Sequence, residues 1–290
     1  MKKIFLFFAV FAATALWTGC EPIVDKHDAG GSIAATELQA TATSVVKDGK
    51  NTNKVHVRCT SPVLCQWSDG VNTLTATEGY LTLLLTGEQT ITLTAMTADG
   101  TTLTKSFTVN VEDMTEPVDP AFGFFCGSGE KVWEWNTTED VPEHVVESPG
   151  DPHIWALCMA GTKPDGKYDF WGWRPDPADL SAQCADNGYA NDGTGATMKF
   201  ILSGKKFEKY DKDGTKIGEG KFEFDMTPTS VYGSVGKLTI KDTSILFPYD
   251  RNSGSVPYAG SEFSIIHVDN DRMLLYISAS CGWYYAFTAQ

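Results

Sequence analysis

The sequence predicts an all-β protein with two successive domains, a smaller one over residues 34–112 and a larger one over residues 121–290. Thr36–Val111 contains eighteen threonines and alternates apolar with polar residues at the period of two that half-buried strands show. Beyond residue 121, Trp, Tyr, Phe and Gly replace threonine, and short strand-like runs recur between turn signals. No helical periodicity of useful length is visible in the larger domain, so we expect strands throughout.

The clearest strands of the smaller domain form a hairpin. Thr90–Met96 alternates strictly, Asp99-Gly100 supplies a tight turn, and Thr104–Val111 returns with the same alternation. Lys54–Cys59 and Tyr80–Leu85 are expected as further short strands. These runs predict an antiparallel sheet structure that begins soon after residue 34.

Trp67, which precedes Ser68-Asp69-Gly70, and the terminal hairpin around the Ala98–Thr101 turn together resemble the PKD/immunoglobulin-like modules of bacterial surface proteins. The resemblance implies a β-sandwich with Trp67 in its core and a role as a spacer. A second ligand site on this domain stays open as an alternative. Four acidic residues and two prolines within Glu112–Pro120 then break the strand pattern, so residues 113–120 are expected as a linker.

The larger domain carries a series of short strands separated by turns such as Asp213-Gly214, a pattern typical of a sandwich, jelly roll or barrel. The expected strands are Lys131–Trp135, Ala196–Leu202, Lys206–Tyr210, Gly220–Asp225, Lys237–Lys241, Glu262–Val268, Met273–Ile277 and Trp283–Thr288.

The order of aromatic and glycine positions in this domain gives a sharper resemblance. It runs from Lys131–Trp135 through a Trp/Gly/Pro-rich region, Gly195–Phe200 and Gly220–Phe224 to Trp283–Phe287. It resembles the C-terminal β-sandwich domain of Bacteroidetes PKD-containing surface lipoproteins from polysaccharide-utilisation systems. The resemblance implies a jelly-roll-like sandwich that captures glycan beside an outer-membrane transporter and its partner binding lipoprotein. It transfers no individual ligand residue to this chain.

The first nineteen residues read as an export signal. Lys2 and Lys3 precede the apolar stretch Ile4–Leu16, which is too short to span a membrane, and Thr18-Gly19-Cys20 resembles a bacterial lipobox. We expect lipidation of Cys20, a flexible tether over residues 20–33, and a position on the outer membrane facing the cell exterior. Ordinary secretory cleavage near the same place is the alternative.

Charge and cysteine content narrow the setting. The formal net charge is −14, and removal of the two leader lysines leaves 21 basic and 37 acidic residues, a charge of −16. This argues against nucleic acid or an anionic membrane face as the main ligand.

The six cysteines other than Cys20 allow fifteen disulfide pairings or buried free thiols, and Cys59 and Cys65 are close enough in sequence to close a local loop. The six are Cys59, Cys65, Cys126, Cys158, Cys184 and Cys281.

Residues 133–192 carry the chemistry expected of a sugar site. Seven large aromatic residues fall between Trp133 and Trp173, and a loop rich in acids and amides follows. A sugar offers an apolar face for an aromatic ring and a rim of hydroxyls for carboxylate, amide or guanidinium groups. The candidate glycan-binding residues are Trp155, Asp169, Trp171, Trp173, Arg174, Gln183, Asn187 and Tyr189.

A structural role competes with binding for the tryptophans. Trp133, Trp135 and Trp283 are expected in the core, whereas Trp155, Trp171 and Trp173 are undecided between core and ligand contact. No cofactor or zinc site is expected, although the acidic loop leaves a Ca²⁺ ion open as an alternative.

Catalytic signatures are weak. Glu223-Phe224-Asp225 resembles part of the ExDxxE strand of retaining β-glucanases, but Pro228 stands where the last acid is required. We therefore expect a non-catalytic, lipid-anchored glycan-binding protein. The alternatives are an adhesin, fimbrial or other protein-binding surface module and a surface glycoside hydrolase or lyase.

Overall fold

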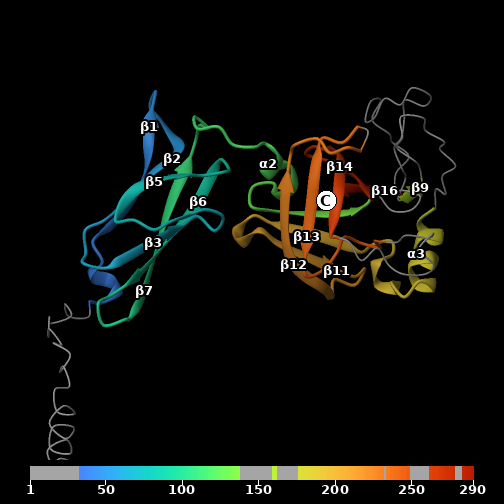
Figure 1. Cartoon of the computed structure of the whole chain (residues 1–290), viewed down its shortest axis with the longest axis horizontal. Coiled ribbons are helices and arrows are strands. Elements are labelled where there is room, and N and C mark those ends of the chain that lie inside the picture. The colour runs from blue at the N-terminus through green and yellow to red at the C-terminus, as the bar shows by residue number, and fades with distance from the viewer. Residues whose placement is uncertain (1–32, 138–158, 162–175, 232, 249–260, 278–282) are drawn as a thin grey trace, which may run out of the picture.

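The computed structural model describes residues 33–137, 159–161, 176–231, 233–248, 261–277 and 283–290. Within these residues the chain forms two β-rich units with separate hydrophobic cores (Figure 1). Strands dominate both units, so the all-β prediction is confirmed.

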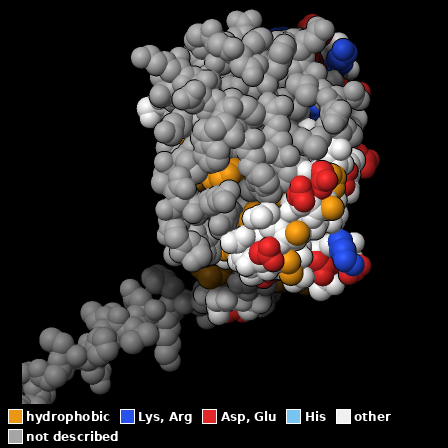
Figure 2. Space-filling view, turned by 90° about the vertical axis from the view of Figure 1, so that its right-hand side faces the viewer, with side chains coloured by type: hydrophobic (Ala, Val, Ile, Leu, Met, Phe, Trp, Pro, Cys, Tyr) orange, Lys and Arg blue, Asp and Glu red, His pale blue; other side chains and the backbone are white. Residues whose placement is uncertain are grey.

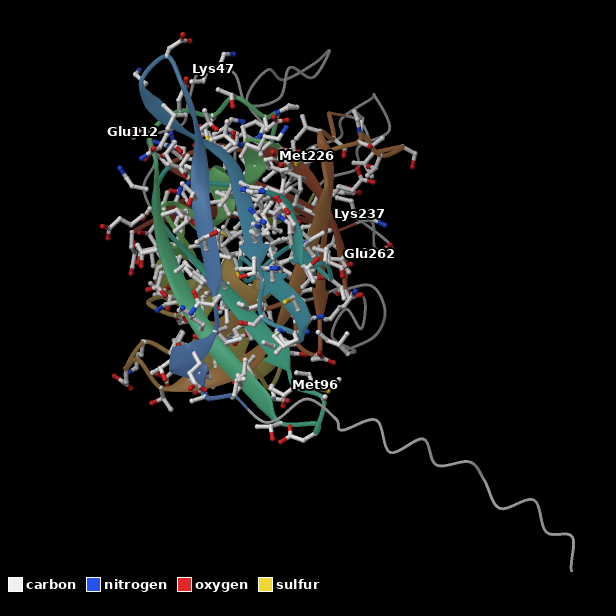
Figure 3. All side chains as sticks on the ribbon, turned by 90° about the vertical axis from the view of Figure 1, so that its left-hand side faces the viewer. Lys47, Met96, Glu112, Met226, Lys237 and Glu262 are labelled. Atoms are coloured by element: carbon white, nitrogen blue, oxygen red, sulfur yellow. The ribbon has the colours of Figure 1, made fainter. Side chains whose placement is uncertain are left out.

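The first unit packs two antiparallel sheets face to face. One sheet has the order β1-β2-β5 and the other the order β4-β3-β6-β7. The strands are β1 (Ala40–Lys47), β2 (Lys50–Cys59), β3 (Leu64–Ser68), β4 (Thr73–Leu74), β5 (Glu78–Thr82), β6 (Gly87–Met96) and β7 (Thr102–Val111). Trp67 is fully buried between the sheets and donates a hydrogen bond from Nε1 to the Ala76 carbonyl at 3.0 Å, which confirms its place in the core. Figure 3 looks onto this unit, with Lys47 and Glu112 at one end and Met96 at the other.

The second unit is a closed antiparallel barrel in place of the expected jelly-roll-like sandwich. Its described strands are β8 (Glu130–Trp135), β9 (Met159–Gly161), β10 (Thr197–Ile201), β11 (Lys206–Tyr210), β12 (Lys216–Asp225), β13 (Gly236–Lys241), β14 (Glu262–Val268), β15 (Arg272–Ile277) and β16 (Trp283–Ala289). From β10 to β16 each strand pairs with the next along the chain, and β8 pairs with both β10 and β16. The ring therefore closes, and eight described strands complete it without an exposed edge.

Strand β9 continues the line of β8. One edge of β16 is occupied by β15 from Trp283 to Thr288. On its other edge β16 pairs with β8 through Phe287–Ala289 and with β9 through Trp283–Tyr285. The chain thus leaves the barrel after β8, and at β9 it returns to the same edge of β16, nearer the N-terminal end of that strand.

Side chains fill the barrel interior. Trp133 and Trp135 on β8 and Trp283 on β16 are at most 1% exposed, which confirms their prediction as core residues. They pack in one cluster with phenylalanines from four further strands, namely Phe200, Phe207, Phe222 and Phe263. An eight-stranded ring is just wide enough for such a filling.

Two helices correct the expectation of strands alone. Helix α2 (Ala121–Cys126) precedes the barrel, and α3 (Pro177–Asp186) lies within what reads as a loop. Asp176 caps α3 through Oδ1, which accepts hydrogen bonds from the Ala178 and Asp179 amides at 2.8 Å. Asp followed by Pro is a helix-start signal in the sequence, but a ten-residue helix with only Leu180 and Cys184 buried shows little periodicity. No helix among the described residues is long and apolar enough to cross a membrane.

The segment between the two units is hydrogen-bonded to the sandwich. Asn53 is fully buried, and its Oδ1 accepts hydrogen bonds from the Thr115 and Glu116 amides at 2.9 Å. Its Nδ2 donates to the carbonyls of Leu83 at 3.1 Å and Glu116 at 3.0 Å. Because all four hydrogen-bonding positions of the amide are used, the first part of the segment is fixed to β2.

The two units also touch directly. The Gly204 amide donates to the Gly70 carbonyl at 2.6 Å, and Leu85 of the sandwich is buried in the hydrophobic cluster of the barrel. Gly70 has φ +90, and a Cβ there would lie 2.7 Å from Ser203 Oγ. This close approach requires glycine for two independent reasons, backbone conformation and space.

Candidate functional site

The two ends of the barrel differ in their connections. At the end that faces the sandwich lie the short turns 202–205 and 269–271 and the connection 226–235, and α2 packs into the hydrophobic cluster of the barrel. At the opposite end, which we call the far end, the chain makes the connections β8 to β10, β13 to β14 and β15 to β16. Figure 1 places α2 beside the sandwich and α3 on the opposite side of the barrel. Long connections held by a rigid scaffold are where binding residues are usually found.

All the candidate glycan-binding residues belong to the connection between β8 and β10. Five of them lie outside the described residues, namely Trp155, Asp169, Trp171, Trp173 and Arg174. Gln183, Asn187 and Tyr189 are described, and they follow one another around the C-terminal end of α3. The structure thus brings three of the eight together on one short element at the far end.

Two of these three side chains, those of Asn187 and Tyr189, have structural partners. Asn187 Nδ2 donates to the Gln183 carbonyl at 2.8 Å and so helps to end α3. Tyr189 is half-buried, with its ring 5.8 Å from that of Phe247 in an edge-to-face arrangement. Burial raises the pKa of Tyr189, and the nearby Asp192 carboxylate raises it further. Asn187 is therefore the weakest of the three as a ligand contact, because its amide already serves the helix.

A buried ion pair anchors this element to the barrel. The Asp192 carboxylate lies 3.1 Å from Lys209 Nζ, with side chains 4% and 9% exposed. Asp192 Oδ2 also accepts the Phe247 amide at 2.8 Å, and its carbonyl accepts Trp135 Nε1 at 2.8 Å. One aspartate therefore joins the end of the β8–β10 connection to strands β8 and β11 and to Phe247 in the β13–β14 connection.

In the sequence Asp192 reads as one acid of a long loop, whereas the structure buries its side chain. Its partner Lys209 sits at an inward position of β11, between fully buried Phe207 and the end of the strand. A lysine in phase with buried apolar residues was the available signal, since such a charge requires a buried partner.

Residues 245–247 cover the far end of the barrel. Ile245, Leu246 and Phe247 are fully buried, and Phe247 adopts a left-handed backbone with φ 40. The two glycines of β12 that precede Phe222 leave room for Lys241 and Thr243, which come just before this segment. A Cβ at Gly218 would lie 2.7 Å from Thr243 Oγ1, and one at Gly220 would lie 1.9 Å from the Lys241 carbonyl oxygen. The described part of the far end is therefore filled by buried side chains, which include the ion pair of Asp192 and Lys209.

The described surface around α3 is acidic. Asp176, Asp179 and Asp186 are exposed on or beside the helix. Figure 2 shows acidic side chains on the described part of this face. Among the described residues no three His, Cys, Asp or Glu side chains are placed to hold a metal ion.

The outer wall of the barrel carries paired charges. Lys237 and Glu262, labelled in Figure 3, are 2.8 Å apart, and Lys241 lies 2.6 Å from Glu223. Glu223, part of the incomplete β-glucanase-like triplet, is thus engaged with a lysine on the neighbouring strand. That lysine lowers the pKa of the Glu223 carboxyl.

All four described cysteines are buried thiols, namely Cys59, Cys65, Cys126 and Cys184. Cys59 and Cys65 lie in the sandwich core. Burial is the main cause that raises the pKa of Cys65 to about 12, and the neighbouring Cys59 thiol raises it further. Cys126 at the end of α2 is fully buried, and burial raises its pKa to about 12. Cys158 and Cys281 lie outside the described residues, as does the expected lipid anchor Cys20.

Comparison with known proteins adds little to this geometry. No family model and no curated protein matches the sequence. Among solved structures, the PKD1 domain of Vibrio anguillarum Epp is similar at 18% identity over 26% of this chain and 94% of that domain, with a TM-score of 0.21. A TM-score this low does not support a shared fold, so the class of protein is assigned from the strands and their pairing. The molecule is a two-domain all-β protein. More particularly, it joins an antiparallel sandwich through a fixed segment to an eight-stranded barrel with long connections at one end.

Proposed function

We propose that this protein is a cell-surface glycan-binding protein, anchored by a lipid on Cys20, that captures a polysaccharide or oligosaccharide without cleaving it. The sandwich acts as a PKD/immunoglobulin-like spacer, and the far end of the barrel binds the ligand. An outer-membrane transporter and a partner binding lipoprotein would receive the glycan.

One observation carries this proposal. The connection that holds the aromatic-rich sequence leaves and rejoins the barrel at the end opposite the sandwich. The near end is occupied by α2 and by the contact between Gly70 and Gly204. We infer that a long polymer reaches the barrel from the far end, because the sequence of this connection includes, over Tyr168–Asp176, aromatic residues together with carboxylates and a guanidinium.

Acidity favours a neutral ligand over an anionic one. The mature chain carries a formal charge of −16, and exposed aspartates surround α3. Sulfated or uronate-rich polymers would be repelled by this surface.

The test is gel retardation of the chain from Glu21 onward in native gels containing starch, mixed-linkage β-glucan, xyloglucan, galactomannan, polygalacturonate or chondroitin sulfate. We expect retardation by one neutral polymer. Trp171→Ala and Trp173→Ala should each weaken it about 5- to 100-fold, the range expected for loss of one stacking ring. Leu64→Ala, which truncates a side chain 67% exposed on the sandwich, is the matched control and should bind like the wild type.

Melting temperatures separate binding from folding. Unchanged melting with lost retardation assigns the tryptophans to the ligand, whereas a large drop in melting temperature assigns them to the core. Uniform mobility of a folded protein in every gel contradicts glycan binding and favours a protein partner. Release of reducing sugar during the assay contradicts the non-catalytic proposal.

Cys20→Ala tests the anchor. In cells that process the signal, this variant should lose incorporation of labelled palmitate and leave the membrane fraction. Retained membrane association would contradict lipid anchoring at this residue.

A further inference from the structure

A groove of about 590 Å³ lies where the sandwich meets the segment that leads to the barrel. Its walls come from the sandwich and from that segment, and include Asn72, Leu74, Tyr80, Thr82, Glu116 and Asp119. The groove is remote in sequence from the aromatic-rich connection of the far end. It lies on the sandwich, for which the sequence indicated a spacer.

Tyr80 gives the groove an aromatic surface. Its side chain is 56% exposed, and it is the one aromatic side chain among the described residues that is largely exposed. An exposed tyrosine on a strand of a monomeric domain is unremarkable alone, but here it borders a hollow that also contains carboxylates.

Neighbouring side chains hold the ring in place. The His56 ring packs against it from β2, with centroids 5.1 Å apart. Lys54 Nζ lies 5.2 Å from the centroid of the Tyr80 ring and 3.1 Å from Glu116 Oε1. One lysine therefore contacts both the ring and the carboxylate beside it, which reduces the side-chain entropy to be lost on binding.

The rim of the groove supplies acceptors for hydroxyl groups. Glu116 is paired with Lys54, and Asp119 Oδ1 accepts the Ala121 amide at 2.9 Å. Because an ionised carboxylate has about four acceptor positions, each of these groups retains capacity for a further hydrogen bond.

The shape of the groove is set before any ligand arrives. Asn53 holds Thr115 and Glu116 through three of its hydrogen bonds, and Pro117 follows immediately. The wall made by the linking segment is therefore fixed to the sandwich where it begins, and a preformed site loses less affinity to ordering.

We propose that this groove is a second saccharide site, in which one ring of a neutral glycan stacks on Tyr80 while its hydroxyls donate to Glu116 and Asp119. This inference rests on the proposed function, since it extends glycan capture from the far end to the junction. Two carboxylates against one lysine disfavour a uronate or sulfated ring. Two sites on one rigid chain would raise the apparent affinity for a long polymer above that for a short one.

The experiment uses the chain from Glu21 onward, the neutral polysaccharide that retards it, and an oligosaccharide of six to eight rings from that polymer. Tyr80→Ala should weaken retardation by the polymer about tenfold, whereas Tyr80→Phe, which keeps the ring, should lose less than threefold. Glu116→Gln should weaken it severalfold, and Leu64→Ala is the control for an exposed apolar truncation on the same domain. Titration calorimetry with the oligosaccharide should give two sites for the wild type and one for Tyr80→Ala.

The outcomes separate this inference from the proposed function. If the wild type binds and Trp171→Ala weakens binding but Tyr80→Ala equals the wild type, the junction site is wrong and far-end capture stands. If Tyr80→Ala weakens binding and the tryptophan variants do not, the junction is the main site. If no polymer retards the wild type, both proposals fall. A melting temperature of Tyr80→Ala more than a few degrees below that of Leu64→Ala would also overturn the assignment, because the ring would then be structural.

Discussion

Both ends of the barrel are closed by packed residues, but different interactions hold the closing residues in place. The near end is closed by α2, whose Phe125 ring stacks on Phe224 and lies tilted against Phe200, both with centroids 5.3 Å apart, in an apolar contact. The far end is closed by residues 245–247 and by the element after α3, and a buried ion pair joins them. Apolar packing tolerates small shifts, whereas a buried charge demands its partner. The far end is therefore specified by polar geometry, at the place where long connections must be held in register.

The largest effect is expected from Asp192→Ala. It leaves the Lys209 ammonium uncompensated in the barrel and removes the acceptor of the Phe247 amide. The free energy of unfolding should fall by about 3–5 kcal/mol in urea denaturation. Glu223→Ala breaks an exposed pair of the same chemistry and should cost at most about 1 kcal/mol. Equal effects for the two variants would contradict the conclusion that the buried ion pair specifies the far end.

A second buried polar group stabilises the junction. Asn53→Ala leaves the Thr115 and Glu116 amides and the Leu83 carbonyl without their partner. We expect a loss of about 2–3 kcal/mol in the unfolding free energy, since some of these groups regain water. Asn110→Ala on exposed β7 is the control and should change stability by less than about 0.5 kcal/mol. A near-zero effect at Asn53 would mean that the linking segment moves freely.

The contact between the two units gives a smaller effect. Gly70→Ala adds a Cβ at φ +90 and only 2.7 Å from Ser203 Oγ, so it carries both backbone strain and a clash. Gly100→Ala has the same strain at φ +85 with nothing within 4 Å. We expect about 2 kcal/mol for Gly70 and about 1 kcal/mol for Gly100. Small-angle scattering should show a larger radius of gyration for Gly70→Ala alone, and identical curves would contradict a fixed junction.

The smallest effect at neutral pH concerns Cys126. Because burial raises the pKa of this thiol to about 12 from an unfolded value near 9, the thiol stays protonated in the fold. Its contribution to stability is complete below pH 9 and is lost as pH rises from 9 toward 12, where the unfolded chain ionises first. Iodoacetamide at pH 8.5 should therefore leave Cys126 unmodified until denaturant is added, as mass spectrometry of its peptide would show. Rapid labelling of the native protein would contradict closure of the near end by α2.

Much of the secondary structure could be read from the sequence. Strand β14 agrees with the expected Glu262–Val268 at both ends, and the expected hairpin lies within β6 and β7. The alternation of apolar and polar residues is a local property of a strand, so it does not depend on how the strands pair or how the sheets close. The expected strand Tyr80–Leu85 is too long, because β5 ends at Thr82 and Leu84–Leu85 turn toward the barrel, and strands β1, β3, β4 and β9 were not among the expected strand ranges.

Sheet closure and the polar anchors were decided by tertiary structure. A run such as Lys237–Lys241 presents the same alternation in a sandwich and in a barrel, and only the pairing of β16 with β8 distinguishes them. Likewise, the sequence shows Asn53, Asp192 and Lys209 as ordinary polar residues, although each is buried and bonded to segments 17 or more positions away. The sequence alone determined the strands, the tryptophan cores and the likeness of the first twenty residues to an export signal, because these depend on neighbours along the chain. Closure of the ring, the fixed junction and the groove at Tyr80 depend on contacts between distant segments, which local pattern does not encode.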